Sequence, residues 1–280
     1  MTLTTLVTDL SFGEGPRWRN GHLYYSDFYQ HTVSRVDVDG NVSVVARVAN
    51  QPSGLGWMPD GDLLIVSMLD QKLLRQHSDG RLTEHADLGN VATGHCNDMV
   101  VDGKGRAYVG NFGYDNRVKG AKPVPADLAF VDVDGTVTCA ATGFMFPNGS
   151  VITPDEKTLI VAETMGRRLS AFTIDSNGSL SNRRIWADLG PHYPDGICLD
   201  EKGAVWIADP VRRALVRVEE GGNITDRIEA GYPVYACMLG GVDGKRLFAC
   251  TGLASGDEAA ATRNGKIEYV DVEHALAGYP

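Results

Sequence analysis

The feature that most constrains the fold of this chain is an internal repeat. Six segments share one template: a short entry containing glycine or a polar residue, an apolar strand, a turn such as "PDG", and further strands that end at another turn. The second residues of the six entries lie at positions 15, 54, 98, 149, 196 and 237, so neighbouring units are 39 to 51 residues apart. This spacing is typical of the blades of a β-propeller, which are roughly 40–50 residues long.

Each unit contains short runs of β-branched and aromatic residues bounded by turn residues, without helical spacing. Examples are "LYYSDF", "LLIVSM", "AYVGNF", "LIVAET", "VWIADP" and "LFACTG". We therefore predict an all-β fold, a six-bladed β-propeller with four-stranded antiparallel blades, in a single domain over residues 1–280. The segment "LTTLVTDL" precedes the first unit and predicts an outer strand for the sixth blade, which would remove an exposed sheet edge.

The longest insertion between predicted strands is "GYDNRVKGAKPVPADL", over residues 113–128. Its glycine, proline and charged residues predict a loop, and a loop of this length in a compact domain is often functional.

Composition and charge exclude several classes of function. The 280 residues are 43% hydrophobic, as in a globular protein, and the net charge of −10 disfavours binding to nucleic acid. The first residues lack the pattern of a signal peptide, and no apolar run reaches the roughly 18 residues of a membrane span, so we expect a cytoplasmic protein without a membrane partner. Five cysteines without zinc-type spacing are expected to be buried or partly buried free thiols.

Residues that bear a carboxylate or amide oxygen occupy equivalent places in four of the six units. The residue before each position given above is called a hub residue here, and the six are Glu14, Ser53, Asn97, Asn148, Asp195 and Ala236. The innermost strands of a propeller line its central channel, so equivalence in the repeat predicts convergence in space. Converging carboxylates repel, and buried polar oxygens without partners cost several kcal/mol. A divalent cation would resolve both costs: oxygen ligands favour Ca²⁺, with Mg²⁺, Mn²⁺ or Zn²⁺ also possible.

The motifs "GEGPRW", "ND…VDGKGRAYVGN", "PNGSVITPDEKTLIVAET" and "PDGICLDEKGAVWIAD" resemble those of the regucalcin/gluconolactonase family of six-bladed propellers, over nearly the whole chain. The resemblance implies that Glu14, Asn148 and Asp195 are direct metal ligands and that Asn97 lies near the metal or contacts substrate. It also implies a metal-dependent lactonase acting on sugar-acid lactones or related molecules. His95 stands where sugar-lactone members have an arginine, so the substrate is expected to differ.

The proposed reaction is attack of water on a metal-polarised lactone carbonyl, with Asp195 and Asn97 as candidate catalytic residues. Candidate substrate contacts lie close in sequence to the predicted ligands or to the long insertion: Asn97, His95, Phe112, Tyr114, Phe144 and Tyr235. Glu163 and Asp209, near the ends of second strands, are expected to form hydrogen bonds between blades. Two alternatives remain open, a calcium-dependent phosphotriesterase-like hydrolase and a non-catalytic calcium-binding propeller. The patterns predict a small-molecule lactone as partner and leave the oligomeric state open.

Overall fold

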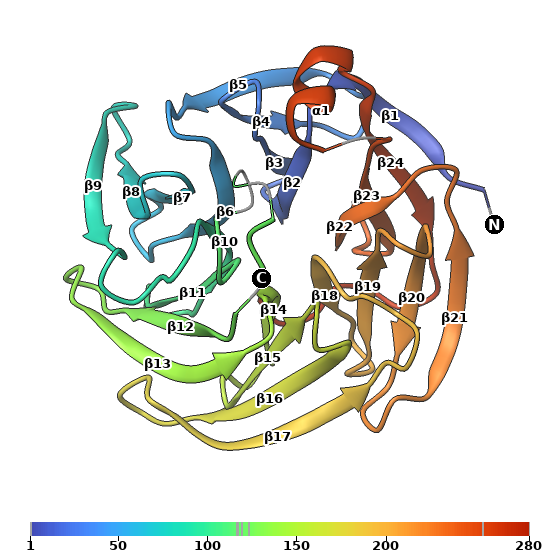
Figure 1. Ribbon diagram of the computed structural model, residues 1–280. Helices are drawn as coiled ribbons and strands as arrows, with labels where there is room; N and C mark the ends of the chain where they lie inside the picture. The colour runs from blue at the N-terminus through green and yellow to red at the C-terminus, as the bar shows by residue number, and fades with distance from the viewer. Residues whose placement is uncertain (1, 116–117, 119, 123, 254, 280) are drawn as a thin grey trace.

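Six four-stranded antiparallel sheets are arranged around a central axis, which confirms the predicted six-bladed β-propeller (Figure 1). The computed structural model describes residues 2–115, 118, 120–122, 124–253 and 255–279. Each blade runs from an innermost strand to an outermost strand. Blade 1 consists of β2 (Gly13–Arg19), β3 (His22–Asp27), β4 (Thr32–Val36) and β5 (Val42–Arg47). Blade 2 consists of β6 (Pro52–Trp57), β7 (Leu63–Ser67), β8 (Lys72–Gln76) and β9 (Leu82–Asp87). Blade 3 consists of β10 (Cys96–Val101), β11 (Ala107–Asn111), β12 (Ala126–Val131) and β13 (Val137–Phe144).

Blades 4 to 6 follow in the same order around the ring (Figure 1). Blade 4 consists of β14 (Pro147–Ile152), β15 (Thr158–Glu163), β16 (Arg168–Ile174) and β17 (Leu180–Asp188). Blade 5 consists of β18 (Ile197–Leu199), β19 (Val205–Asp209), β20 (Ala214–Val218) and β21 (Ile224–Glu229). Blade 6 consists of β22 (Val234–Gly240), β23 (Arg246–Thr251), β24 (Gly265–Asp271) and β1 (Thr4–Leu10). The strand β1 pairs antiparallel with β24, so the N-terminal segment completes blade 6 as predicted.

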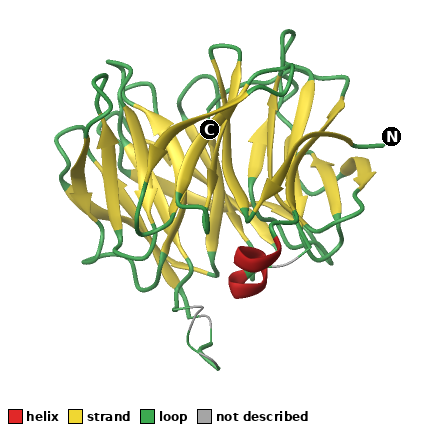
Figure 2. Cartoon of the chain, turned by 90° about the horizontal axis from the view of Figure 1, so that it is seen from above, coloured by secondary structure: helices red, strands yellow, loops and turns green. Residues whose placement is uncertain are grey.

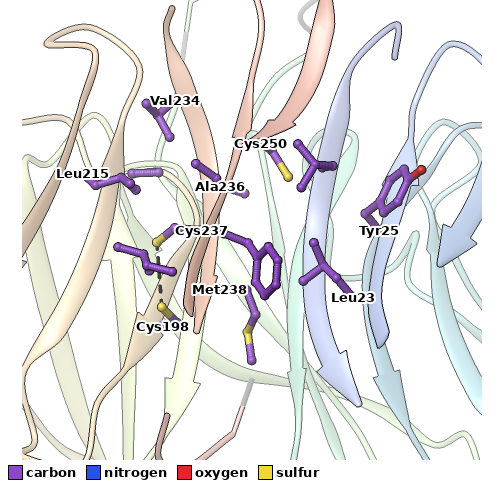
Figure 3. Packing of buried hydrophobic residues seen from close by; sticks show 14 of the residues in the cluster. Leu23, Tyr25, Cys198, Leu215, Val234, Ala236, Cys237, Met238 and Cys250 are labelled. Atoms are coloured by element: carbon purple, nitrogen blue, oxygen red, sulfur yellow. Dashed lines mark hydrogen bonds between the residues drawn. The ribbon is translucent and has the colours of Figure 1, made fainter. Parts of the chain in front are cut away.

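The hydrophobic core consists of apolar clusters that lie mainly between neighbouring blades. The largest cluster joins blades 5, 6 and 1, where Leu23 and Tyr25 of β3 face Met238 of β22 and Cys250 of β23 (Figure 3). Every face of these sheets packs against the next blade, and burial of such apolar area is the dominant stabilising contribution, about 25 cal/mol per Å². The repeat therefore folds as a ring because each blade buries its faces against its neighbours.

Glycine follows a hub residue where the next blade comes into backbone contact. A Cβ at Gly149 would lie 2.6 Å from the amide nitrogen of Ile197, and one at Gly15 would lie 2.7 Å from the carbonyl oxygen of Ser53, where φ is also +54°. A side chain at either position would push two inner strands apart. In these pairs the oxygen-bearing residue thus lies at the central channel, and the glycine allows the neighbouring blade to come into backbone contact.

The two faces of the ring differ (Figure 2). The first strand of each blade begins at one face, called the mouth face here, where the loop after β11 and the helix α1 (Gly256–Thr262) are also located. The C-terminal segment crosses the opposite face, called the floor face. Its backbone bonds to three blades in turn, through Leu276 to Gly244, Ala277 to Leu199, and Tyr279 to Ile152.

Several local expectations need correction. The first residues of β12 lie inside the segment 113–128 that was predicted to be loop, and the helix α1 was not predicted at all. Cys139 is exposed, whereas the other four cysteines are buried free thiols. No helix among the described residues is both long enough and apolar enough to cross a membrane.

Candidate active site

The six hub residues lie at equivalent places at the start of the innermost strands. Glu14 is the second residue of β2 and pairs with Ser26 of β3, and Asn148 is the second residue of β14. Asp195 comes just before β18 and donates its backbone N–H to the carbonyl oxygen of Ala208. All four oxygen-bearing hub residues are buried, with exposed fractions of 2–9%.

A chain of side-chain hydrogen bonds joins four hub residues from successive blades. The Ser53 hydroxyl donates to Oδ1 of Asn97 (3.3 Å), and Nδ2 of Asn97 donates to Oδ1 of Asn148 (2.9 Å). Nδ2 of Asn148 then donates to the carboxylate of Asp195 and to the hydroxyl of Thr164 (3.1 Å). The structure therefore brings Asn97, Asn148 and Asp195 together, as the repeat predicted.

The two hub carboxylates are held in an environment that disfavours their charge. Burial raises the pKa of Glu14 well above its usual value, and the negative charges of Asp195 and Asp98 raise it further. Burial likewise raises the pKa of Asp195, and the charges of Asp98 and Asp209 add to this effect, against a hydrogen bond from Asn148 that lowers it.

An ion pair between blades lies beside these carboxylates. Arg17 of β2 binds Oδ1 of Asp98 in β10 at 2.6 Å, and the two residues are 2% and 4% exposed. The same guanidinium donates to the carbonyl oxygens of Leu55 (3.0 Å) and Met99 (2.6 Å), so it ties blades 1, 2 and 3 together. With all groups ionised, the three carboxylates of Glu14, Asp98 and Asp195 against one guanidinium leave a net charge of −2.

The donor set suits a cation that prefers oxygen. Across the described ranges, no group of three or more His, Cys, Asp or Glu side chains is placed to hold a metal ion. The hub instead offers two carboxylates and the amides of Asn97 and Asn148, whose oxygens are ligands for Ca²⁺ or Mg²⁺. The Asn148 amide donates Nδ2 to Asp195 here, and a turn about its last side-chain bond exchanges that nitrogen for the oxygen.

Glu163 and Asp209 fix the entry loops of their own blades. Oε2 of Glu163 accepts the backbone N–H of Met145 (3.0 Å), and Oδ2 of Asp209 lies 2.7 Å from Nδ1 of His192. Met145 precedes β14 and His192 precedes β18, so both contacts lie within one blade and its entry. The expected bonds between blades are therefore wrong, although both side chains do serve as hydrogen-bond partners.

The predicted substrate contacts fall into two groups. His95, Phe112, Tyr114 and Tyr235 lie at the mouth face: His95 is 5% exposed, its Nε2 lies 3.5 Å from Oδ1 of Asp115, and the other three are partly buried. Phe144 lies elsewhere. It is completely buried in the cluster between blades 3 and 4, and the guanidinium of Arg183 lies 4.4 Å from its ring centre.

The aromatic residue from this segment that reaches the mouth face is Phe146, whose ring centre lies 4.7 Å from that of Phe112. The sequence-based choice missed it because Phe146 has a φ of +62°, so the alternation of side chains along β13 does not continue to β14. Arg17 and Thr164 were also missed as hub partners, and Ser53 was placed at the hub without a predicted bond. Each stands in or beside a motif that already supplied a hub residue, and proximity to that motif was the available signal.

Comparisons with known proteins show the family of this chain. Residues 12–252 match the model of the SMP-30/gluconolactonase/LRE-like region. The pentonolactonase XacC of Haloferax volcanii is 28% identical over 267 residues, covering 93% of this chain and 88% of the relative. A 6-deoxy-6-sulfogluconolactonase of Pseudomonas putida is 25% identical over 237 residues, covering 81% and 79%.

Solved structures share the fold. Regucalcin of Agrobacterium tumefaciens, described as a calcium-binding protein, superposes with a TM-score of 0.83 at 22% identity and covers 100% of this chain and 96% of its own. A gluconolactonase of Xanthomonas campestris gives a TM-score of 0.79 at 22% identity, covering 97% and 89%. The family model spans the hub from Phe12 to Gly252, and the chain belongs to the SMP-30/gluconolactonase/LRE-like family.

Proposed function

We propose that this protein is a divalent-metal-dependent lactonase with its active site at the hub. The observation that carries the proposal is the charge imbalance there. Among the residues that the structure describes, Glu14 and Asp195 form no ion pair, and the guanidinium of Arg17 nearby is paired with Asp98. A bound divalent cation would offset the net charge of −2 and the cost of burying the carboxylates.

Relatives support the choice of reaction. Two curated relatives that cover most of the chain are named as a pentonolactonase and a 6-deoxy-6-sulfogluconolactonase. Lactone hydrolysis needs an electrophile for the carbonyl oxygen and a base for the water, and the hub provides residues for both tasks.

Five of the six hub residues have a role in the proposal. Glu14, Asn148 and Asp195 would hold the cation through oxygen atoms, and a bound divalent cation supplies Lewis acidity that polarises the lactone carbonyl. Asp195 accepts the proton of the attacking water. Asn97 is held by Ser53 and Asn148, and the second hydrogen of its Nδ2 remains to orient the ester of the substrate.

Single-turnover and steady-state assays test the proposal. The chelated protein should hydrolyse no lactone, and adding back Ca²⁺, Mg²⁺, Mn²⁺ or Zn²⁺ separately should restore activity with at least one of them. Asp195→Asn should abolish the restored activity, while Asp257→Asn, which removes an exposed carboxylate on α1, should leave it unchanged. Full turnover by the chelated protein or by Asp195→Asn would refute the proposal.

A non-catalytic calcium-binding role is the second candidate, because a solved structure with the same fold is described as a calcium-binding protein. It predicts calcium binding by calorimetry, lost in Asp195→Asn, together with no hydrolysis of lactones or phosphotriesters under any metal. Turnover of either substrate class excludes this role, and turnover of phosphotriesters alone would replace the lactonase assignment.

A further inference from the structure

The residues just above the hub decide which lactone can reach it. Because each innermost strand begins at the mouth face, the residues that precede a hub residue lie on its mouth side. Two places before the six hub residues stand Phe12, Gln51, His95, Phe146, Tyr193 and Val234. Three of these six are aromatic carbocycles, and Tyr235, one place before Ala236, adds a fourth. We call Phe12, Phe112, Phe146, Tyr193 and Tyr235 the aromatic layer.

Ring contacts join four of the five members in two pairs, while the fifth, Tyr193, has the guanidinium of Arg167 5.4 Å from its ring centre. On blades 1 and 6, the centre of the Phe12 ring lies 4.5 Å from that of Tyr235 and 5.1 Å from that of Phe28. On blades 3 and 4, Phe112 lies 4.7 Å from Phe146 and 6.5 Å from the ring of His95. Such tilted and edge-on pairs hold aromatic side chains in fixed places.

The helix α1 extends the apolar wall on the side of blade 1. Ala259 of α1 is fully buried against Phe12, Phe28 and Met68, and the backbone N–H of Gly256 donates to the hydroxyl of Tyr29 at 2.7 Å. The Tyr29 hydroxyl is thereby engaged by protein. The helix therefore adds apolar contact at the mouth face without adding a free hydroxyl.

Electrostatics connect the layer to the hub. Burial raises the pKa of Tyr235 to about 12, and the negative charges of Asp195 and Glu14 contribute to the rise. The ring of Tyr235 is thus close enough to both carboxylates to be affected by them, while part of its surface stays exposed. The backbone confirms that Tyr235 and Asp195 are neighbours, because Gly196, next to Asp195, donates its N–H to the carbonyl oxygen of Tyr235 at 2.8 Å.

The rim above the layer carries exposed aliphatic side chains beside exposed arginines, Arg167, Arg212 and Arg213. Exposed aliphatic side chains follow the second strands of four blades at the mouth face: Val124, Met165, Val211 and Leu253 are 43–60% exposed. Exposed apolar groups that gather around an entrance commonly mark a binding site for an apolar group.

From this arrangement we infer that the substrate is a lactone whose ring bears or is fused to a hydrocarbon group, aryl or alkyl, in place of the hydroxyls of a sugar lactone. A polyhydroxylated ring needs a hydrogen-bond partner for almost every carbon, and each hydroxyl buried without one costs about 1–3 kcal/mol. Of the six places above the hub, three hold aromatic side chains and one holds Val234, which leaves Gln51 and His95 as the polar ones. This inference rests on the proposed function and specifies its substrate class.

A matched pair of δ-lactones tests the inference. The metal-loaded enzyme is assayed with a benzo-fused δ-lactone and with glucono-1,5-lactone, and the ratio of the two kcat/KM values is measured. We expect the ratio to exceed about 10, because even one methylene in an apolar pocket is worth roughly 10–200-fold. Non-hydrolysable lactams of the same two shapes should show the same order of inhibition constants.

Variants show whether the aromatic layer sets the ratio. Tyr235→Ser and Phe112→Ser should each lower the ratio at least about tenfold. Tyr24→Ser is the matched control: Tyr24 is also partly buried and also packs edge-on against an aromatic ring, that of Trp57, but lies outside the aromatic layer, so the ratio should not change.

The outcomes separate the two proposals. Equal or greater efficiency with glucono-1,5-lactone, or the same ratio in all three variants, overturns the inference and leaves the lactonase assignment in place. Failure to hydrolyse any lactone under any metal overturns the proposed function and the inference together. Circular dichroism and binding of the lactams identify a variant that has simply failed to fold.

Discussion

Two groups of buried carboxylates lie in the same propeller, and they are neutralised in different ways. In the first turns of blades 3 and 5, Asp102 binds Arg106 and Asp200 binds Arg217, each at 2.7 Å between a carboxylate oxygen and Nε. Each of these carboxylates also accepts two backbone N–H groups. At the hub, Glu14 and Asp195 are also buried, and neither forms an ion pair with an arginine in the described part of the chain.

Under the proposed function, the difference separates carboxylates that stabilise the fold from carboxylates that would bind a cation. A buried ion pair with satisfied hydrogen bonds needs no further partner, whereas unpaired buried carboxylates raise their pKa and destabilise the charged state. Buried carboxylates with raised pKa values are typical of functional sites, where a bound ligand offsets the free-energy cost of burying their charge.

The largest expected effect is on catalysis. Asp195→Asn keeps the shape of the side chain and removes its charge, so it should lower the kcat/KM for lactones by about 10³-fold or more, because the base and one ligand charge are lost together. Asp200→Asn, at a paired carboxylate, should leave kcat per folded molecule unchanged. Progress curves on purified protein at equal folded concentration check both values. Equal losses in the two variants would break the comparison.

The next effect is on stability, and it has the opposite pattern. Asp200→Asn leaves Arg217 buried without its carboxylate, so the free energy of unfolding should fall by about 3–5 kcal/mol. Urea unfolding followed by fluorescence measures the change. In chelated protein, Asp195→Asn should not lower the free energy of unfolding by a similar amount, because the carboxylate that it removes has no cationic partner.

Metal binding should offset the cost at the hub. At a calcium concentration about 100 times the dissociation constant, the free energy of unfolding should rise by about 2.7 kcal/mol. The rise should vanish in Asp195→Asn and persist in Asp200→Asn, as measured by thermal unfolding with and without chelator. A rise of the same size in both variants would show that calcium binds elsewhere.

The smallest effect concerns pH. The folded pKa values of Glu14 and Asp195 are raised above the ordinary values of 4.5 and 3.8, so in chelated protein the folded state binds protons more strongly than the unfolded state. Their contribution to stability is fully present below the unfolded pKa and is lost as pH rises through the raised folded pKa. Glu14→Gln should therefore lose less stability than wild type between about pH 5 and 8. Urea unfolding at a series of pH values checks this, and parallel curves would contradict it.

The sequence predicted most of the fold because the repeat determines the period, the strand pattern and the place of the hub residues together. It predicted four hub residues from one alignment of the units, and the closing strand β1 from the leftover segment. It did not predict α1, because a helix of seven residues is too short to be stable alone and depends on the burial of Ala259.

The finer parts of the candidate site were harder to predict, because they depend on backbone geometry and on contacts between distant residues. The positive φ of Phe146 exchanges which of two phenylalanines reaches the mouth. The pairing of Arg17 with Asp98 joins positions 81 residues apart, and no local pattern reports it. Glu163 and Asp209 were expected to bond between blades because they stand near the ends of second strands, but their partners lie in the entry loops of their own blades.

Blade 6 contains strands from both ends of the chain, and this has a consequence for ion choice. The pairing of β1 with β24 closes the ring, so the distance between two blades cannot increase unless the neighbouring blades shift as well. The gap between Glu14 on blade 1 and Asn148 on blade 4 is then fixed by the whole circumference. Selectivity for ionic radius would therefore be a property of the closed ring. Weakening the pairing of β1 with β24 should reduce discrimination between large and small cations, although no ligand residue is changed.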